Sequence, residues 1–562
     1  MDAEPWIKHY DKGVPPSLEP YPDHTVVEIV RKRASEMPER PALFFKGSSM
    51  TWADLDTLGN ALAAAFLSEG LKKGDRVVLL MPNSPQMIIC ELAIWKIGAV
   101  AVPVNPLYTE HELGYALKEC GAEIAVVLTP FYRKIRSVMS STGLKKVIAT
   151  NIKEYLSPLK KALFTLLKEK KDGHAVTLDD GDLWLRDMIR ANLGSPAPVC
   201  AVNPADPALF LFTGGTTGKP KCAVCTHRAI VISGMQIAWW FSVVLDRGID
   251  IIMLNMPLFH VYAQVGILGA VFVDGYPFVL VPNPRDLDDL VATIKKLKPA
   301  VLPGVPTLFN ALINHPRVIK DSKALASLKL CVSGAAPLLL EIKKRFEELT
   351  GGRIIDAYAL TESMIGSVLT PVLGTYKEGS VGIPAPDIEI RIVDEEKESR
   401  ELPSNEIGEV IMRAPQLMKE YWQRPEETVT AIRNGWLFTG DLGYIDDDGY
   451  LFIIDRKKDV IKPCGFQVWP KDVEEVIASH PDVREVGVAG VPDDYQGEAV
   501  KAWVVLREDG QLDANELREF CKTRLTAYKV PKYIQFTDDL PKSLVGKVLR
   551  RKLVEEHCAA VS

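Results

Sequence analysis

Short apolar runs bounded by glycine, proline or asparagine alternate with longer amphipathic stretches from Arg76 onward. This alternation is typical of βαβ units with a parallel sheet. The first series of predicted elements is a strand at Val77–Met81, a helix at Pro85–Lys96, a strand at Ala99–Val104, a helix at Glu110–Glu119 and a strand at Ile124–Leu128. The second series has strands at Ile251–Leu254, Phe278–Val281, Ala300–Leu302, Leu328–Val332 and Ile354–Ala357, with helices at Leu287–Leu297 and Leu338–Leu349. We therefore expect two doubly wound α/β subdomains.

The pattern changes after about Thr375. Alternating polar and apolar residues at Ile388–Val393 and Gly408–Arg413 predict a small antiparallel β unit, and the turn at 446–449 precedes a predicted strand at Tyr450–Ile454. The charged connector 456–459 then leads into a segment large enough for its own core. We predict a large N-terminal domain at 1–455, a hinge at 456–459 and a small, mobile α+β domain at 460–562.

One uncharged apolar run, Ala229–Leu245, approaches membrane-spanning length. It is shorter than about 20 residues and includes Ser233, Gly234 and Gln236, so a buried core helix is the favoured interpretation. The start of the chain has no apolar signal-peptide region, and nine scattered cysteines fit a reducing compartment. A net charge of −6 gives no reason to expect nucleic acid. A cytoplasmic protein is expected.

Residues 152–171 interleave apolar side chains with six lysines. Ser157 and Pro158 suit the N-cap and first position of a helix. A basic amphipathic helix can lie on an anionic membrane, here the inner face, or pack on its own domain. Own-domain packing is favoured, and peripheral membrane contact stays open.

The strongest chemical signal is the run Thr213-Gly214-Gly215-Thr216-Thr217-Gly218-Lys219-Pro220-Lys221, which follows the apolar strand Ala208–Phe212. Glycines let backbone amides approach a polyphosphate, while threonine hydroxyls and lysines contact its oxygens. The run is not a Walker A loop, because Thr213 replaces the first glycine and Pro220 follows the lysine. It predicts a nucleotide site of another kind.

Four further motifs join this loop: Tyr358-Ala359-Leu360-Thr361-Glu362, Thr439-Gly440-Asp441, Asp455-Arg456-Lys457-Lys458-Asp459 and Pro541-Lys542-Ser543-Leu544-Val545-Gly546-Lys547. Together they resemble the adenylate-forming superfamily of acyl-CoA synthetases, luciferases and adenylation domains, from about Thr25 to Leu553. Within it, the chain is most similar to bacterial long-chain fatty acyl-CoA synthetases. The resemblance implies that a carboxylate attacks the α-phosphate of ATP, and that CoA then displaces AMP from the acyl-adenylate.

The resemblance assigns the phosphate contacts to Thr213, Gly214, Gly215, Thr216, Thr217, Gly218 and Lys221. It implies that Glu362 and Thr213 hold Mg²⁺, which prefers oxygen ligands. The adenosine contacts are assigned to Gly334, Ala335, Ala336, Asp356, Tyr358, Thr361, Asp441 and Arg456. Taken alone, Asp441 reads as a turn residue and Tyr358 as a core residue, so only the motifs support these roles.

The remaining implied roles concern catalysis and CoA. Lys547 matches the lysine that bridges the carboxylate and the α-phosphate, and His260 matches a histidine beside the acyl carboxylate. Lys458 takes the hinge position about which the small domain rotates. Rotation would bring Gly465 and Phe466 to the CoA tunnel. Outside the motifs, Lys547 would read as a surface residue and His260 as a structural one.

The chain departs from the family pattern at two places. Cys222 replaces a glycine and is followed by Cys225 and His227, which leaves thiol sensitivity favoured over zinc ligation. Ala359 replaces another glycine, which is costly if the backbone there needs a positive φ. A homologue that binds nucleotide or acyl group but turns over poorly therefore stays a second hypothesis.

The segments Val104–Thr109 and 465–470 resemble fatty acyl-CoA synthetases more than acetate enzymes. We expect a medium- to long-chain fatty acid as substrate, with ATP, Mg²⁺ and CoA. A coumarate-like aryl acid is the runner-up. A carrier-protein acceptor and a homodimer stay open.

Overall fold

The N-terminal part of the chain is built around two large sheets. The computed structural model describes residues 4–213, 220–321, 323–334, 338–394, 400–493, 495–542 and 548–561. The first sheet has the order β7-β6-β5-β3-β4-β8-β9 and is parallel except at the β8–β9 pair. Its strands are β7 Leu183–Trp184, β6 Lys146–Thr150, β5 Ile124–Leu128, β3 Arg76–Leu80, β4 Val100–Pro103, β8 Pro207–Phe212 and β9 Cys222–Thr226.

The second sheet has the order β16-β15-β14-β13-β12-β10-β11-β1-β2. It is parallel from β1 to β14, with antiparallel pairs at both ends. Its strands are β16 Ile383–Pro384, β15 Val368–Leu369, β14 Arg353–Tyr358, β13 Leu330–Ser333, β12 Val301–Gly304, β10 Ile252–Leu254, β11 Phe278–Leu280, β1 Pro41–Phe45 and β2 Ser48–Thr51. The predicted doubly wound subdomains are therefore confirmed.

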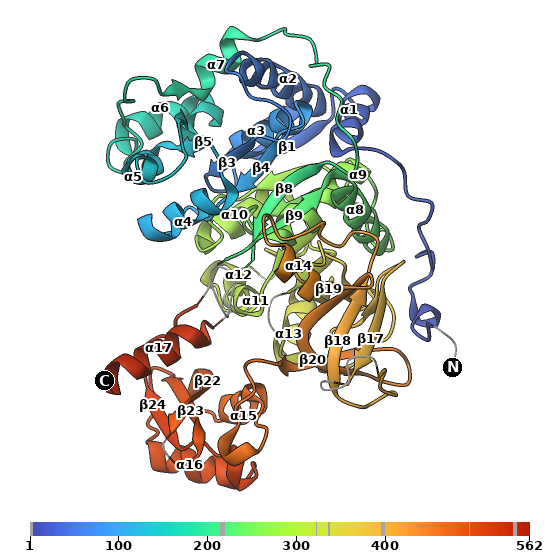
Figure 1. Cartoon of the computed structure of the whole chain (residues 1–562), viewed down its shortest axis with the longest axis vertical. Helices are drawn as coiled ribbons and strands as arrows, with labels where there is room; N and C mark the ends of the chain where they lie inside the picture. Colours follow the sequence, from blue (N-terminus) through green and yellow to red (C-terminus); the bar gives the residue numbers. More distant parts are fainter. Residues whose placement is uncertain are drawn as a thin grey trace.

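Helices surround and separate these sheets (Figure 1). Every residue of α3 is buried, and α8 packs against α9 so closely that a Cβ on Gly234 would lie 2.5 Å from the Gly269 carbonyl. The helices of this part are α1 Val26–Glu36, α2 Trp52–Ser68, α3 Pro85–Lys96, α4 Glu110–Cys120, α5 Tyr132–Met139, α6 Pro158–Leu167, α7 Leu185–Ala191, α8 His227–Phe241, the π-helix η4 Tyr262–Ile267, α9 Leu268–Asp274, α10 Leu287–Leu297, α11 Pro306–Ile313, α12 Pro316–Lys320 and α13 Leu340–Thr350.

A smaller antiparallel sheet follows, as the alternating pattern predicts. Its order is β17-β18-β20-β19, and β21 pairs with β20. The elements are β17 Glu389–Val393, β18 Gly408–Arg413, α14 Pro425–Ala431, β19 Ile432–Arg433, β20 Trp436–Ile445 and β21 Leu451–Arg456. The β20–β21 register places Asp441 opposite Arg456.

The C-terminal segment forms a separate lobe, drawn in red in Figure 1. Strand β22 pairs antiparallel with β23, which pairs parallel with β24, and helices pack on this sheet. The elements are α15 Pro470–Ala478, β22 Val483–Asp493, β23 Gly497–Leu506, α16 Ala514–Lys522, β24 Tyr533–Phe536 and α17 Arg550–Val561. Arg550 contacts Asp455 at 3.1 Å and Asp459 at 3.2 Å, so an ion-pair network ties this lobe to both ends of the connector.

The apolar run Ala229–Leu245 belongs to a core helix, as predicted, although α8 begins at His227 and ends at Phe241. In the described part of the chain, no helix is long and apolar enough to cross a membrane.

The basic segment 152–171 packs on its own domain in its first part, where Ile152, Tyr155 and Leu156 lie against the hydrophobic core, whereas the helix that follows is exposed. Helix α6 begins at Pro158 as predicted, but none of its residues is buried, and the Ser157 side chain makes no capping hydrogen bond. Within α6, Phe164 is partly buried, with its ring edge-on to the His174 ring at 5.1 Å. The alternating lysines and leucines specify an amphipathic helix but not which face meets the protein.

Candidate nucleotide-binding and active site

The base of the predicted phosphate loop is closed by two hydrogen bonds. The Thr213 amide donates to the Lys221 carbonyl at 2.9 Å, and the Lys221 amide donates to Thr213 Oγ1 at 3.3 Å. Strands β8 and β9 therefore hold the two ends of the loop together. Predicted residues Gly214, Gly215, Thr216, Thr217 and Gly218 lie outside the described residues.

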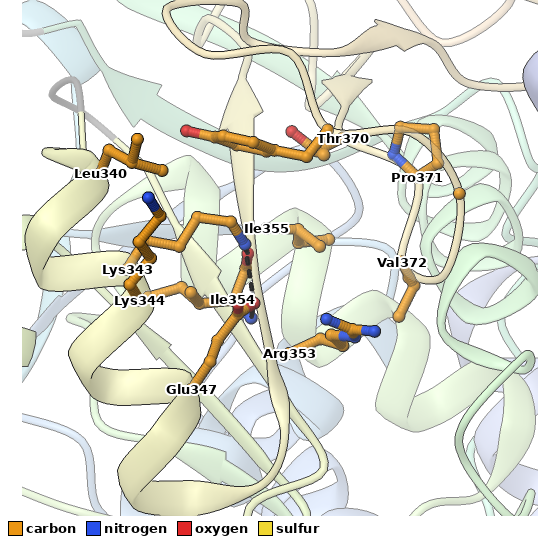
Figure 2. A pocket seen from close by; sticks show the side chains of 12 residues that line it. Leu340, Lys343, Lys344, Glu347, Arg353, Ile354, Ile355, Thr370, Pro371 and Val372 are labelled. Carbon is orange, nitrogen blue, oxygen red and sulfur yellow. Dashed lines mark hydrogen bonds and ion pairs between the residues drawn. The ribbon is translucent and has the colours of Figure 1, made fainter.

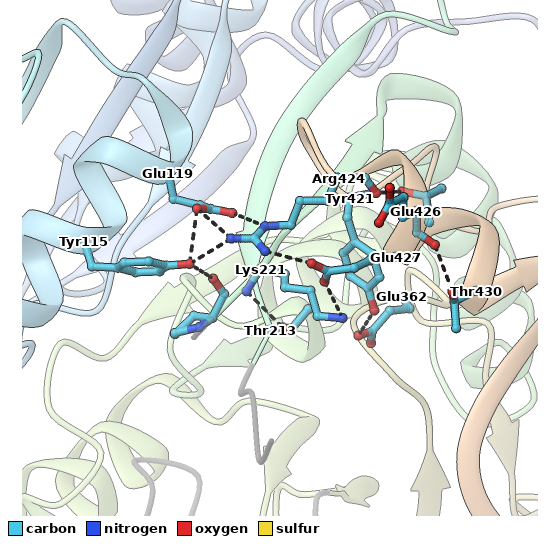
Figure 3. A network of polar contacts seen from close by, with 12 residues as sticks. Tyr115, Glu119, Thr213, Lys221, Glu362, Tyr421, Arg424, Glu426, Glu427 and Thr430 are labelled. Carbon is cyan, nitrogen blue, oxygen red and sulfur yellow. Dashed lines mark hydrogen bonds and ion pairs between the residues drawn. The ribbon is translucent and has the colours of Figure 1, made fainter. Parts of the chain in front are cut away.

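Glu362 and Lys221 meet around the ring of Tyr421 (Figure 3). The Tyr421 hydroxyl donates to Glu362 Oε1 at 2.6 Å, and the Lys221 ammonium lies 4.2 Å from the centre of the tyrosine ring. Lys221 also pairs with Glu427 at 3.0 Å. The predicted metal carboxylate and a phosphate-loop cation thus share one neighbourhood, although they are far apart in sequence.

Backbone strain marks the turn after Thr361 and Glu362. Met364 and Ile365 both have positive φ, 47° and 61°, a region that bulky side chains avoid. The strained turn is held by the buried Ser233 hydroxyl, which donates to the Met364 carbonyl at 2.5 Å. Backbone strain persists only where the surrounding structure holds it in place, and strained residues cluster at functional sites.

Asp441, Arg456 and Tyr358 form the predicted ribose side. Asp441 is 4% exposed, and its carboxylate accepts from the Tyr358 hydroxyl at 2.8 Å and pairs with Arg456 at 3.0 Å. Burial raises the pKa of Tyr358 well above its usual value, and the nearby Asp441 charge adds to this effect. The phenol therefore stays a proton donor, and the structure brings these three predicted residues together.

The predicted adenine side lies at the ends of β13 and β14. Gly334 follows β13, and a Cβ there would lie 3.6 Å from the Tyr262 ring. Asp356, 8% exposed, has its pKa raised to about 7 by burial, with Lys343 opposing the shift. Ala335 and Ala336 lie outside the described residues.

His260 precedes the π-helix η4, a form of helix that is frequent at functional sites. Its Nδ1 is buried without a hydrogen-bond partner in the described structure, and burial lowers its pKa to about 4. His260 is therefore neutral near pH 7. One turn further along η4, the buried Gln264 leaves both amide atoms without partners in the described structure.

The predicted hinge lysine lies near the nucleotide residues. Desolvation and Arg456 lower the pKa of Lys458, whereas Asp459, Asp441 and Glu362 raise it, so its ammonium interacts electrostatically with these groups. Gly465 ends the short helix Pro463–Gly465, and the 56%-exposed Phe466 stacks on Tyr528 within the C-terminal lobe. These contacts place Phe466 on the surface of its own lobe. Lys547 lies outside the described residues.

The residues that depart from the family pattern are accommodated by the fold. Burial raises the pKa of both Cys222 and Cys225, and both side chains are fully enclosed in β9, which contradicts the predicted thiol sensitivity. Among the described residues no three histidine, cysteine or acidic side chains gather as metal ligands. Ala359 does not have a positive φ, so its methyl group causes no backbone strain.

Sequence reasoning missed a polar network beside the loop (Figure 3). Arg424 pairs with Glu119 at 2.6 Å and with Glu427 at 2.7 Å. The Tyr115 hydroxyl donates to the Pro220 carbonyl at 3.1 Å. These contacts join α4, the loop and the start of α14. The run Arg424–Glu427 contains residues of opposite charge, and this sequence pattern is the same as that of an ordinary solvent-exposed segment.

A cavity of about 250 Å³ lies between α13 and the strand β14, outside the predicted site (Figure 2). Its lining includes none of the predicted site residues. Lys343 pairs with Glu347 of the same helix at 2.7 Å, and its ammonium also donates to the Ile354 carbonyl of β14. A large cavity is the default candidate for a binding site, but the predicted residues Asp356 and Tyr358 lie at the other end of β14.

This fold and site define the class of protein. The model for the AMP-binding enzyme family matches residues 30–422, and the model for its C-terminal domain matches residues 472–547. The chain therefore belongs to the AMP-binding enzymes, as the motifs predict.

Among proteins of known function, the long-chain-fatty-acid–CoA ligase of Bacillus subtilis is 37% identical, over 99% of both chains. The 4-coumarate–CoA ligase 3 of rice is 30% identical, over 97% of this chain and 94% of that protein.

Solved structures share the fold. ATP-bound MatB from Rhodopseudomonas palustris is 27% identical, with a TM-score of 0.83 over 96% of this chain and all of that chain. A fatty acyl CoA synthetase from Mycobacterium tuberculosis is 28% identical, with a TM-score of 0.72 over 95% of this chain and 99% of that chain.

Proposed function

We propose that this chain activates a medium- to long-chain fatty acid with ATP, releasing pyrophosphate, and then transfers the acyl group from acyl-AMP to CoA. The main support is the arrangement of two clusters, Tyr358–Asp441–Arg456 and Thr213–Lys221–Glu362, which are close enough for Arg456 and Glu362 to interact electrostatically. Similarity to a long-chain-fatty-acid–CoA ligase along the full chain supports the choice of acid.

Each cluster has a distinct task in the first half-reaction. Asp441 accepts hydrogen bonds from the ribose hydroxyls, while Arg456 neutralises its buried charge. Thr213 and Lys221 hold the outer phosphates, and the neutral His260 faces the acyl carboxylate without adding charge. Lys547 supplies the cation that stabilises charge developing between carboxylate and α-phosphate.

Glu362 and Thr213 fit a magnesium ion because both present oxygen, the ligand that Mg²⁺ prefers together with substrate phosphates. Glu362 keeps one carboxylate oxygen, Oε2, that is not engaged by Tyr421. When bound, the ion neutralises phosphate charge. Lys221, whose ammonium lies 4.2 Å from the Tyr421 ring, would share that task.

The second half-reaction requires the C-terminal lobe, 460–562, to turn about the hinge 456–459 relative to residues 1–455. The lobe has its own core, including Val473, Ile477 and Leu517, so it can move as a unit. Rotation carries Lys547 away and brings Gly465 and Phe466 to the site, where they border the CoA path. The exposed position of Phe466 suits a residue that changes partners.

Product analysis tests this proposal directly. The purified protein is incubated with ATP, Mg²⁺, CoA and acids from acetate to palmitate, with coumarate included, and AMP and thioesters are followed by mass spectrometry. We expect AMP and fatty acyl-CoA in equal amounts. Coumaroyl-CoA as the preferred product would replace the fatty acid by an aryl acid. Acyl-AMP without thioester would indicate that the acyl acceptor is a carrier protein. Nucleotide binding without any product would indicate a homologue that binds its ligands but turns over poorly.

We further propose that residues 152–171 contact an anionic membrane surface, from which a long-chain acid is delivered. Leu159, Leu163, Leu166 and Leu167 recur at helical spacing in α6 and are 73%, 48%, 79% and 69% exposed. The lysines flanking them, which attract anionic headgroups, are Lys160, Lys161, Lys168, Lys170 and Lys171.

Vesicle co-sedimentation tests this contact. The full chain should bind phosphatidylglycerol vesicles and not phosphatidylcholine vesicles, and Leu163→Glu with Leu166→Glu should abolish binding while leaving octanoate turnover unchanged. A matched exposed change far from α6, Val429→Glu, is the control. Equal sedimentation of wild type and the α6 variant would refute the contact. The homodimer stays a prediction, which sedimentation velocity would test.

A further inference from the structure

The segment that carries Tyr421 is fixed to the strand that leaves the phosphate loop. The Val224 amide donates to the Glu420 carbonyl and the Lys419 amide to the Val224 carbonyl, both at 2.9 Å. The Trp422 amide donates to the Cys222 carbonyl at 2.8 Å. Tyr421 is therefore held on the edge of β9 by backbone contacts on both sides of it.

The Tyr421 side chain joins two groups that are far apart in the sequence, Glu362 and Lys221. It is 4% exposed, its hydroxyl donates to Glu362 at 2.6 Å, and its ring faces the Lys221 ammonium at 4.2 Å. The backbone of the same segment holds the Glu362 turn, because the Met418 amide donates to the Glu362 carbonyl at 2.9 Å. Glu362 itself is only half-buried.

We propose that Tyr421 is a positioning residue for adenylation, which fixes Glu362 and Lys221 relative to each other for a magnesium–nucleotide complex. This inference rests on the proposed function. The hydroxyl engages Oε1, so the carboxylate is held in one orientation with Oε2 directed elsewhere. The ring face attracts the lysine ammonium without neutralising its charge.

Tyr421→Phe tests the role, because it removes the hydroxyl and leaves the ring. A hydrogen bond to a charged group corresponds to roughly a tenfold change in an equilibrium constant. We expect the Mg²⁺ concentration for half-maximal ATP binding, measured by calorimetry without acid or CoA, to rise about tenfold. Conversion of supplied acyl-AMP to acyl-CoA should be unchanged, because it needs no pyrophosphate release.

The control is Tyr450→Phe, which removes a buried hydroxyl that donates to the Thr375 carbonyl at 2.9 Å, away from this network. It should leave the Mg²⁺ dependence at the wild-type value. A Tyr421→Phe protein with wild-type Mg²⁺ dependence would overturn the proposal. So would additive losses in a Tyr421→Phe, Glu362→Gln double variant, because a residue that acts through Glu362 adds nothing once that carboxylate is gone.

Failure of the proposed function gives a different result. If the wild type binds Mg²⁺ and ATP but makes no thioester from any acid, the fatty acid ligase assignment falls. The tenfold shift in Tyr421→Phe would still support the positioning role, because nucleotide binding is measured without acyl substrate.

Discussion

Glu91 lies in the middle of α3 with its carboxyl group sealed from water. The residue is 0% exposed, and neither carboxyl oxygen has a hydrogen-bond partner in the described structure. Desolvation raises its pKa from 4.5 to about 8, and an interaction with Gln264 opposes only part of that shift. Near pH 7 the folded protein therefore keeps a proton that the unfolded chain releases.

The sign of the pH dependence follows from this difference. Between pH 4.5 and 8 the native state binds more protons than the unfolded state, so the free energy of unfolding falls as pH rises. At pH 7 the loss is about 3 kcal/mol, and at pH 5 it is under about 1 kcal/mol. Glu91→Gln keeps the shape of the side chain but cannot ionise, so it should escape this loss.

Melting temperatures across pH 5 to 8 test the prediction. The variant and the wild type should melt within about 1 °C of each other at pH 5, and the variant should melt roughly 3 °C higher at pH 7, given the unfolding entropy of a domain this large. Glu348→Gln on the exposed face of α13 is the matched control and should follow the wild type. A constant gap between Glu91→Gln and wild type at every pH would refute a buried, protonated Glu91.

Two further predictions concern the nucleotide site. Glu427 forms an ion pair with Lys221 at 3.0 Å, so it competes with phosphate for the lysine. Glu427→Gln should free the lysine and lower the Kd for magnesium–ATP severalfold, while Arg424 keeps Glu119 as a partner. An unchanged or higher Kd by calorimetry would contradict this competition. Asp441→Asn should weaken ATP binding roughly a hundredfold, because it removes a buried charged acceptor and leaves Arg456 without its 3.0 Å partner; equal affinity of variant and wild type in the same titration would remove Asp441 from the ribose site.

Much of the architecture could be predicted because local patterns decide it. The helix Pro85–Lys96 and the strand Ile124–Leu128 have the predicted bounds, since proline, glycine and a change of hydrophobic period mark their ends. The meeting of Tyr358, Asp441 and Arg456 was also predictable, because all three lie in recognisable motifs.

The remaining features depend on contacts that no local pattern encodes. Tyr421 meets Glu362 across 59 positions and Arg424 meets Glu119 across 305, so nothing near either residue in the sequence identifies its partner. The positive φ of Ile365 likewise cannot be predicted from the sequence, because isoleucine normally avoids that conformation. The exposure of α6 is not encoded locally either, because interleaved lysines and leucines specify an amphipathic helix but not the surface that its apolar face meets.

The residues that sequence reasoning missed share one physical role. The motif residues are those proposed to contact the nucleotide, whereas Tyr421 and Glu427 contact motif residues, and Arg424 holds Glu427. Segment 419–422 binds β9 through its backbone, and almost any side chain would permit those hydrogen bonds. The contact with Glu362, in contrast, requires the tyrosine hydroxyl. A difference in the Mg²⁺ dependence of ATP binding between Tyr421→Phe and Tyr450→Phe therefore measures how much the contact from outside the motifs contributes to nucleotide binding.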